Sequence, residues 1–488
     1  PGLFCANFPC DSSAFDGFAG AIYSSAVDKC SFLCYTGTTY FFRSSDSTLL
    51  EQGGSSVQRL SKRDSFFVGL TLFSMFFGAG NLIFPPFLGA QAGTDTWPAM
   101  IGFAISAIGL PVLGVVAVAQ SGGLQVLAGR VGKKFAWLFT LLIYVSIGPG
   151  LAIPRTASTS FEMAVSPFWP DAPLWVLCAY SFVFFAVAML VAFKPEKLTD
   201  RLGKALGPIL LALILVMVVG CFVNAPGGYG TPSGNYTGNV VAQGFVDGYQ
   251  TMDTIAALNF GIIIALNIQN RGVTDEKSVV RYTIRAGWIA GAVLLLVYSA
   301  LAHIGAVSGG SFDNYSNGAG VLTNLMSWMY GPAGTALLGL IFVIACLNTC
   351  IGLFSCCSEY FSLQWPKIPY KAWVVIFAVI SFFVSIAGLD TILAISVPIL
   401  SAIYPVAIVL IALGLTHRIT GKAPLCYPVA VAFTILVSVP GALVQAKLLG
   451  GPVAAFLEGL PLYAEGLYWL VPAVLGGVLG AVASCMGL

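Results

Sequence analysis

A short run of helix-breaking and polar residues interrupts the first long apolar stretch of the chain. The run is Phe76-Phe77-Gly78-Ala79-Gly80-Asn81-Leu82-Ile83-Phe84-Pro85-Pro86. Glycines loosen a helical backbone, and each proline removes a backbone donor. In lipid an unsatisfied backbone N–H or C=O costs several kcal/mol, so a broken helix persists only where protein or a cavity uses its free groups. The run therefore indicates a binding site of the kind that transporters carry.

A break in this run would expose two kinds of backbone group. The half-helix that starts around Asn81 would present N–H groups, notably those of Ala79 and Gly80, whose partial positive charge suits a substrate carboxylate. The half-helix before it would end with free carbonyls from about Ser74 to Phe77, which suit a hard cation such as sodium. The alternative is a kinked helix whose glycines allow close packing.

A second interrupted run is expected to supply the other half of the site. It reads Thr251-Met252-Asp253-Thr254-Ile255-Ala256-Ala257-Leu258-Asn259-Phe260-Gly261. Asp253 is a functional candidate because a carboxylate inside a bilayer is costly, although it could instead cap a helix near the outer end. We predict the break at Asn259-Phe260-Gly261. Paired interruptions at matching positions of two halves are typical of a transporter site.

Two further segments carry polar groups in apolar surroundings. Asn348 and Thr349 could add side-chain oxygens to a cation site, or Thr349 could bond to its own helix backbone. Arg155 follows a Gly- and Pro-rich broken stretch, and Glu162 lies about two helical turns further on the same face. The two could share a gating network, or both could lie in the outer interface or a loop and be satisfied by water.

The composition predicts an all-α polytopic membrane protein. Of 488 residues, 58% are hydrophobic and 9% charged, against about 25% charged in soluble domains. About twelve apolar runs are each long enough to span a bilayer, and they are too uniformly apolar for the strands of a β-barrel. They lie near residues 66–92, 98–120, 135–153, 174–193, 205–223, 245–269, 286–307, 333–357, 373–389, 391–415, 427–446 and 467–484. Breaks in the first and sixth helices suggest a 5+5 inverted repeat followed by two C-terminal helices.

The loops predict which side each span faces. Basic residues gather before the first span and after the second, fourth, sixth, eighth and tenth. They are Arg59, Lys62, Arg63, Arg130, Lys133, Lys134, Lys194, Lys197, Arg201, Lys204, Arg271, Lys277, Arg281, Arg285, Lys367, Lys371, Arg418 and Lys422, whereas the opposite loops hold little beyond Lys447. The positive-inside rule therefore places both ends of the transmembrane domain in the cytoplasm.

Several classes of function lack support in the sequence. The net charge of +2 is spread among loops and gives no basic face for nucleic acid. The chain has no phosphate-binding loop, no metal-ligand spacing and no nucleophile elbow, so we expect neither an ATP-driven pump nor a membrane hydrolase, and no enzyme.

Residues 1–60 differ from the rest, and we predict the transporter domain at 61–488. The first segment is rich in Ser, Gly and Phe and contains Cys5, Cys10, Cys30 and Cys34. It shows no basic n-region followed by an apolar h-region, so we expect no signal peptide in it. A small disulfide or metal module is one interpretation, although the cysteine spacings match no zinc pattern well. The other is a poorly ordered tail or upstream sequence that is not native, and the initial Pro suggests a fragment or an unusual start.

Two motifs closely resemble those of the bacterial branched-chain amino acid:cation symporters. They are Phe73-Ser74-Met75-Phe76-Phe77-Gly78-Ala79-Gly80-Asn81-Leu82-Ile83-Phe84-Pro85-Pro86 and Gly148-Pro149-Gly150-Leu151-Ala152-Ile153-Pro154-Arg155-Thr156. The resemblance covers residues 60 to 488. That family is similar in turn to transporters with the sodium-coupled leucine-transporter fold, whose first helix carries Gly-Asn followed by an aromatic residue and Pro.

The resemblance implies a set of site residues. Phe77, Ala79, Gly80, Leu258, Asn259 and Phe260 would bind substrate, and Ser74, Phe77, Asn81 and Thr349 would bind the cation. Leu258-Asn259-Phe260-Gly261 matches a Leu-Gly-Phe-Gly break, with Asn259 in place of Gly. Ile255 replaces a threonine that supplies a second cation site in some relatives, which argues against two sodium ions. Arg155, Glu162 and Asp253 are candidates for gating or coupling.

The sequence therefore predicts a symporter of a bacterial inner membrane. It would import leucine, isoleucine and valine with a cation, sodium by resemblance, without an organic cofactor and in an oligomeric state that the sequence leaves open. The alternative is a proton-coupled symporter, or one for another apolar amino acid, of the same fold; Asp253, Glu162 and His303 keep protons open. A channel or a membrane receptor would be a different class, but neither accounts as directly for two broken helices.

Overall fold

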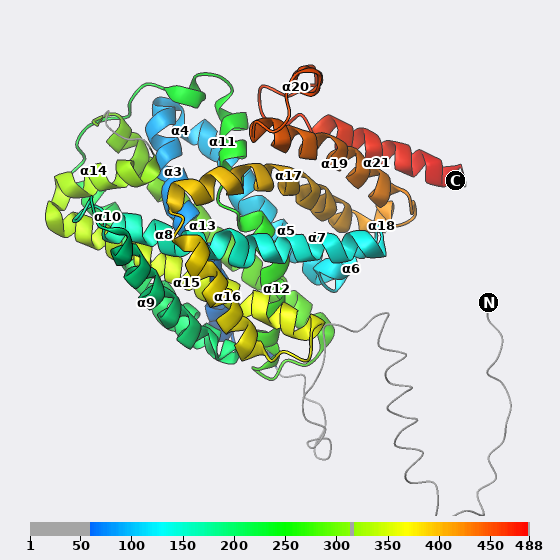
Figure 1. Cartoon of the computed structure of the whole chain (residues 1–488), viewed down its shortest axis with the longest axis horizontal. Coiled ribbons are helices and arrows are strands. Elements are labelled where there is room, and N and C mark those ends of the chain that lie inside the picture. Colours follow the sequence, from blue (N-terminus) through cyan, green and yellow to red (C-terminus); the bar gives the residue numbers. More distant parts are fainter. Residues whose placement is uncertain (1–58, 313–316, 487–488) are drawn as a thin grey trace, which may run out of the picture. The chain divides into compact units, whose positions relative to one another are not determined.

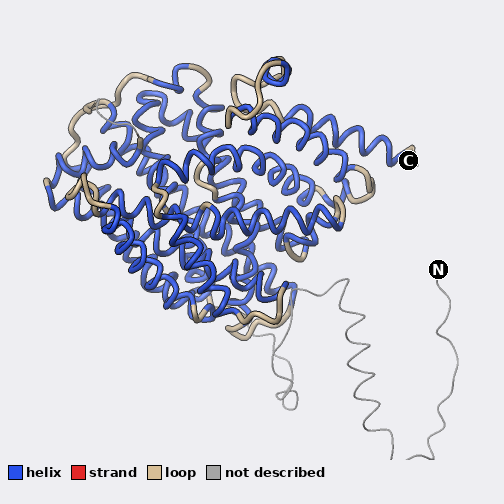
Figure 2. Tube along the Cα trace, in the orientation of Figure 1, coloured by secondary structure: helices blue, strands red, loops and turns tan. Residues whose placement is uncertain are grey.

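Helices make up the part of the chain that the computed structural model describes, residues 59–312 and 317–486, with no strand within those ranges (Figures 1 and 2). These residues belong to one unit that extends from Ser56 to Leu488. The predictions for residues 1–60 fall almost wholly outside the described residues.

The first apolar run folds as two helices separated by two residues. Helix α2 (Lys62–Phe76) starts at Ser61, whose hydroxyl accepts a hydrogen bond from the Asp64 N–H at 3.0 Å. Phe77 and Gly78 are extended, and helix α3 (Ala79–Ala92) follows. The structure therefore confirms the predicted break at Gly78.

The second break lies elsewhere than predicted. Helices α11 (Val240–Tyr249) and α12 (Asp253–Gln269) meet at a bend of 44°. Met252 lies in the left-handed region, with φ 67°. The expectation of a break at Asn259-Phe260-Gly261 is wrong, because these residues continue α12. A carboxylate is stabilised by the free N–H groups of a helix start, which explains why the half-helix begins at Asp253 rather than one and a half turns later.

The third predicted span is interrupted as well. Helix α7 (Lys133–Val145) continues into a π-helical turn (Ser146–Gly150) before helix α8 (Ala152–Ala164). Gly148 departs from helical geometry within that turn, with φ −84° and ψ −129°. The Gly- and Pro-rich stretch before Arg155 is therefore broken, as its sequence indicates.

The remaining helices follow the other predicted runs. They are α4 (Thr96–Ala104), α5 (Leu110–Ser121), α6 (Leu124–Gly129), α9 (Leu174–Ala192), α10 (Gly207–Val223), α13 (Glu276–Gly309), α14 (Gly318–Tyr330), α15 (Pro332–Gln364), α16 (Tyr370–Ser385), α17 (Leu389–Leu415), α18 (His417–Thr420), α19 (Cys426–Gln445), α20 (Pro452–Glu458) and α21 (Leu470–Cys485). Of these, α6, α14, α18 and α20 lie on no predicted span. In Figure 1, α19 and α21 lie side by side and α17 packs against α19.

The number of membrane crossings stays a prediction. Within the described residues, 8 helices are long and apolar enough to span a membrane, or 9 with the bent pair α11–α12. Helices α16 and α21 are apolar but shorter. The twelve spans and the 5+5 inverted repeat are compatible with this arrangement, and both stay predictions.

Helix α3 packs between α13 and α14 by direct backbone contact. A Cβ at Gly305 of α13 would lie 2.6 Å from Cα of Pro86, and one at Gly309 would lie 2.5 Å from Cα of Ala90. A Cβ at Gly318 of α14 would lie 2.7 Å from the carbonyl carbon of Ile83. Small residues permit such approaches, which is how membrane helices pack without a hydrophobic drive between them.

Ion pairs join three of the predicted cytoplasmic segments. Arg271, after α12, contacts the Asp64 carboxylate at 2.9 Å and the Asp200 carboxylate at 3.6 Å. Lys204 pairs with Asp200 at 2.7 Å within the π-helical turn η5 (Thr199–Leu206). These three segments therefore lie at one end of the helices, as the positive-inside pattern requires.

Loops predicted to face the opposite side also contact one another. The Thr94 N–H donates to the Gly230 carbonyl at 3.0 Å, and the Ser233 N–H donates to the Gln91 carbonyl at 2.8 Å. These contacts agree with the predicted sides of the segments that they join. Which side faces the cytoplasm stays a prediction.

The close packing of α3 on α13 predicts the effect of Gly305→Leu. A leucine there meets backbone atoms that cannot move away, so we expect a loss of about 1–3 kcal/mol or more in the free energy of unfolding. Thermal unfolding of the purified protein in detergent measures this. Gly129→Leu at the end of α6 is the control, because a Cβ there meets nothing within 4 Å. Equal midpoints for the two variants would contradict the proposed packing role of Gly305.

Candidate functional site

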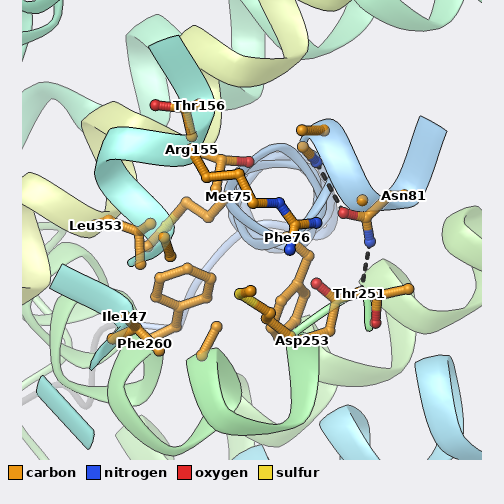
Figure 3. Close-up of a pocket in the computed structure, with 17 residues that line it drawn as sticks. Met75, Phe76, Asn81, Ile147, Arg155, Thr156, Thr251, Asp253, Phe260 and Leu353 are labelled. Carbon is orange, nitrogen blue, oxygen red and sulfur yellow. Dashed lines mark hydrogen bonds between the residues drawn. The ribbon is translucent and has the colours of Figure 1, made fainter. Parts of the chain in front are cut away.

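The three interrupted spans meet at one pocket, which α15 closes (Figure 3). Its lining comprises Met75, Phe76, Gly78, Ala79, Gly80 and Asn81 from the first break; Ile147, Ala152, Arg155 and Thr156 from the third span; Thr251, Met252, Asp253, Ala256 and Phe260 from the α11–α12 break; and Thr349 and Leu353 from α15. The space between these residues, including the part open to solvent, is about 440 Å³.

Three helices begin at this pocket. Helices α3, α8 and α12 start at Ala79, Ala152 and Asp253, and all three residues line it. The first N–H groups of a helix have no carbonyl of their own helix to bond and carry partial positive charge. The pocket wall is therefore suited to bind a negatively charged group.

Asn81 connects the two broken spans through its side chain. Its Oδ1 accepts a hydrogen bond from the Gly78 N–H at 3.0 Å, and its Nδ2 donates to Asp253 Oδ2 at 2.5 Å (Figure 3). Asn81 Nδ2 also donates to the Tyr298 hydroxyl of α13, which in turn donates to Asp253 Oδ2 at 3.0 Å. Asn81 and Asp253 are 1% and 2% exposed. One buried cluster therefore fixes the start of α3 to the start of α12.

Arg155 carries a buried positive charge into the pocket. Its side chain is 6% exposed, and Nη2 donates to the Gln250 carbonyl at 3.4 Å. Nη1 has no hydrogen-bond partner among the residues that the structure describes. A Cβ at Gly80 would lie 2.6 Å from Nη2, so the guanidinium lies against the start of α3. Figure 3 shows the side chain extending from α8 toward that point.

Thr349, a predicted cation ligand, lies against Gly78 at the break between α2 and α3. A Cβ at Gly78 would lie 2.6 Å from Thr349 Oγ1, and this buried oxygen has no partner within the described part of the chain. Ser74 lies about one turn before Phe77 on α2, and its hydroxyl donates to the Leu202 carbonyl at 3.3 Å. A free hydroxyl beside helix-terminal carbonyls offers the oxygen ligands that hard cations prefer.

Not every predicted substrate residue lies at the pocket. Ala79, Gly80 and Phe260 line it, whereas the described residues that line it do not include Phe77, Leu258 or Asn259. The Phe77 ring stacks on Phe73 at 5.2 Å and is fully buried. A direct contact of these three side chains with substrate has no support in this geometry, although the Phe77 carbonyl remains at the α2–α3 break.

The predicted gating residues are only partly brought together. Arg155 and Asp253 both line the pocket, but Glu162 is exposed and accepts a hydrogen bond from Ser166 at 2.9 Å. Arg155 and Glu162 therefore form no common network. His303 also lies outside the lining and is bonded to the Tyr229 hydroxyl at 2.7 Å.

Sequence reasoning missed Tyr298, and it named Thr251 and Met252 only as the start of the second interrupted run. One signal could have identified Tyr298. It carries a hydroxyl within the apolar run of α13, and a buried hydroxyl needs a hydrogen-bond partner. Nothing in the sequence marks Met252 for the left-handed conformation, because such residues are usually Gly, Asn or Asp.

Comparisons with known proteins agree on the family. A family model described as "Branched-chain amino acid transport protein" matches residues 61–486. The chain is 38% identical over 426 residues to the branched-chain amino acid permease BraB of Bacillus subtilis, covering 87% of this chain and 96% of that protein. It is 40% identical over 421 residues to the branched-chain amino acid transport system 2 carrier protein of Pseudomonas aeruginosa, covering 86% and 95%.

Solved structures with a similar fold are more distant in sequence. Mhp1, a nucleobase-cation-symport-1 family transporter, aligns with a TM-score of 0.51 and 13% identity over 86% of this chain and 91% of that chain. A Na⁺-coupled sialic acid symporter aligns with a TM-score of 0.53 and 13% identity over 86% and 90%. At such identity the likeness establishes the fold alone, and it agrees with the predicted leucine-transporter-like fold.

The Asn81–Asp253–Tyr298 cluster predicts the effect of Tyr298→Phe. The change removes a hydroxyl that bonds to a buried carboxylate, and such bonds contribute about 1.5–3 kcal/mol. We expect a lower midpoint of thermal unfolding in detergent. Tyr282→Phe on the same helix, where the hydroxyl takes no part in this cluster, is the matched control. Equal midpoints for the two variants would show that the cluster does not hold the breaks together.

Proposed function

We propose that this chain, which belongs to the family of branched-chain amino acid transport proteins, imports leucine, isoleucine and valine by cation-coupled alternating access. The family consists of transporters and not of enzymes, and the chain is a multi-pass membrane protein. The finer assignment to a bacterial inner membrane, with both ends of the transmembrane domain cytoplasmic, rests on the basic loops and is part of the proposal.

One observation carries the transport mechanism: helix starts and helix ends share a buried pocket. The starts of α3, α8 and α12 suit a carboxylate, and the free carbonyls at the end of α2 suit a cation. Discontinuous helices of this kind line the substrate sites of secondary transporters near the middle of the membrane.

Apolar side chains complete the pocket and support a branched-chain substrate. Phe76, Phe260, Leu353 and Ile147 line it. One methylene more or less in such a pocket changes binding by only about 1–3 kcal/mol. Leucine, isoleucine and valine are therefore expected to compete with one another.

Sodium is the coupling ion that the geometry favours. The carbonyls of Ser74 and Phe77 at the end of α2, with Thr349 Oγ1, would supply oxygen ligands, and the substrate carboxylate would lie on the other side of the same break. Opposite charges bound back to back each favour the binding of the other, and such coupling is reciprocal. Asn81 Oδ1 accepts the Gly78 N–H, and its second lone pair leaves it available as a further ligand of the ion.

A proton is the second candidate, and Asp253 is the observation that favours it. Its carboxylate is buried at the pocket and bonded to Asn81 and Tyr298. A proton taken up there would also change the charge of the site during transport.

Counterflow of labelled leucine in proteoliposomes separates these possibilities. We expect accumulation that a sodium gradient drives and that unlabelled isoleucine and valine suppress. Accumulation that follows a pH gradient and ignores sodium would replace sodium by the proton. Flux without accumulation would indicate a channel, and binding without flux a receptor.

The Thr349 site makes a narrower prediction. Thr349→Ala removes one oxygen ligand and is expected to raise the sodium concentration for half-maximal leucine uptake by roughly tenfold or more, since a bond to a charged group contributes about 1.5–3 kcal/mol. Thr349→Ser keeps the oxygen and should stay near the wild type. An unchanged sodium dependence in Thr349→Ala would exclude this residue from the ion site.

A further inference from the structure

Two opposite side-chain charges line the pocket without pairing with each other. Arg155 reaches in from α8 and Asp253 from α12, and both are more than nine-tenths buried. Within the described ranges, neither charge takes part in an ion pair. A charge inside a membrane domain is costly unless it finds a partner, so each is expected to meet one during the working cycle.

We propose that Arg155 and Asp253 bind the two charges of a free α-amino acid, Arg155 the carboxylate and Asp253 the ammonium group. This inference rests on the proposed function, because it names the groups that recognise the transported substrate. It assigns these two residues to substrate recognition, whereas their sequence positions alone suggested gating or coupling.

The surroundings of Arg155 suit a carboxylate. Nη1 is buried without a partner among the described residues, and Nη2 lies at the start of α3 near Gly80. A guanidinium presents paired donors in a planar fork that matches the two oxygens of a carboxylate. The partial positive charge at the start of α3 lies on the same side, so the side chain and the helix end favour one anion position.

The surroundings of Asp253 suit an ammonium group. Asn81 and Tyr298 both donate to Oδ2, which fixes the orientation of the carboxylate. A carboxylate has about four acceptor positions, so these two bonds leave acceptor capacity for further donors. An ammonium group brings three donors and a full positive charge in direct contact, whereas Arg155 acts on Asp253 only from beyond ion-pair distance.

The remaining walls then define where the substrate side chain lies. Phe76, Phe260 and Leu353 line the same pocket and offer apolar contact. A ligand with the same branched side chain but only one of the two charges would leave either Arg155 or Asp253 buried without a partner. The pocket should therefore reject both the amide and the oxo acid of leucine.

Three ligands with one side chain test this. Leucine carries both charges, leucinamide lacks the carboxylate, and α-ketoisocaproate lacks the ammonium group. Their competition against labelled leucine counterflow, and their effect on thermal unfolding in detergent, give relative affinities for the wild type. We expect leucine to bind at least about tenfold more tightly than either analogue, the factor for losing one bond to a charged group. Wild-type binding of either analogue as tight as that of leucine would overturn the assignment of the corresponding residue, without any variant.

Variants then assign each charge to its residue. Arg155→Gln should weaken leucine and α-ketoisocaproate by about tenfold or more and leave leucinamide nearly unchanged. Asp253→Asn should weaken leucine and leucinamide and spare α-ketoisocaproate. Arg155→Lys, which keeps the charge without the fork, should lie between. Glu162→Gln removes an exposed charge from the same helix as Arg155 and should leave all three ligands as in the wild type.

The outcome of this test is separate from that of the proposed function. If wild-type leucine counterflow is absent, the proposed function fails. If counterflow is present but Arg155→Gln or Asp253→Asn weakens all three ligands by one common factor, transport stands and the assignment is overturned, since the two charges then act on folding or gating alone. Thermal unfolding of each variant without ligand identifies any variant that does not fold. For such a variant, the relative affinities of the three ligands for the wild type test the assignment instead.

Discussion

The Asn81 side chain bonds to backbone on one side and to a buried carboxylate on the other, and the rest of the pocket depends on this arrangement. Its oxygen closes the start of α3 at Gly78, and its nitrogen holds Asp253 at the start of α12. A membrane interior gives broken helices no water to bond to. Two breaks that are far apart in the chain can therefore lie at the same depth only if their polar groups form hydrogen bonds with each other or with a ligand. Asn81 and Tyr298 provide the hydrogen bonds between the two breaks.

Two of the unpaired buried groups lie at the pocket. The helix starts line the pocket, and Arg155 Nη1 and the Thr349 hydroxyl have no partner among the described residues, whereas Arg155 Nη2 donates to the Gln250 carbonyl. Buried polar groups are normally satisfied, so two unsatisfied ones at the same pocket agree with a ligand that binds there. The charges at the pocket, positive along the helix starts and negative at Asp253, fit a small dipolar molecule better than a simple anion or cation.

Local signals in the sequence predicted the fold and the first break. The backbone effects of Gly78, Gly80 and the two prolines extend over only a few neighbouring residues, so they can be read from the local sequence. The length of an apolar run likewise indicates directly whether it can span a bilayer. The second break was displaced because Asn259 and Gly261 look like helix breakers, yet α12 bonds its own backbone through them. The true break depends on Met252 adopting a conformation that its residue type disfavours, and only tertiary contacts select it.

The pocket itself was less predictable than its elements. Arg155, Asp253 and Tyr298 come from α8, α12 and α13, and their meeting depends on how three helices pack. The direction of the Phe77 side chain was not predictable either. Its ring stacks on Phe73, although its backbone lies at the break. Spacing along one helix predicts which residues share a face, but not which neighbouring helix that face meets.

Helix α3 is held on two sides by backbone rather than by side chains, at Pro86 against Gly305 and at Ile83 against Gly318. Side chains between two helices can change rotamer when one helix shifts, so the other helix need not move. Two backbones in direct contact cannot adjust in this way, and a shift of one helix moves the other. A pull on the start of α3 would have to carry α13 and α14 along with it. Helix α3 is therefore expected to stay in place relative to α13 and α14. If the pocket closes around a bound molecule, the helices opposite α3 are the ones that move.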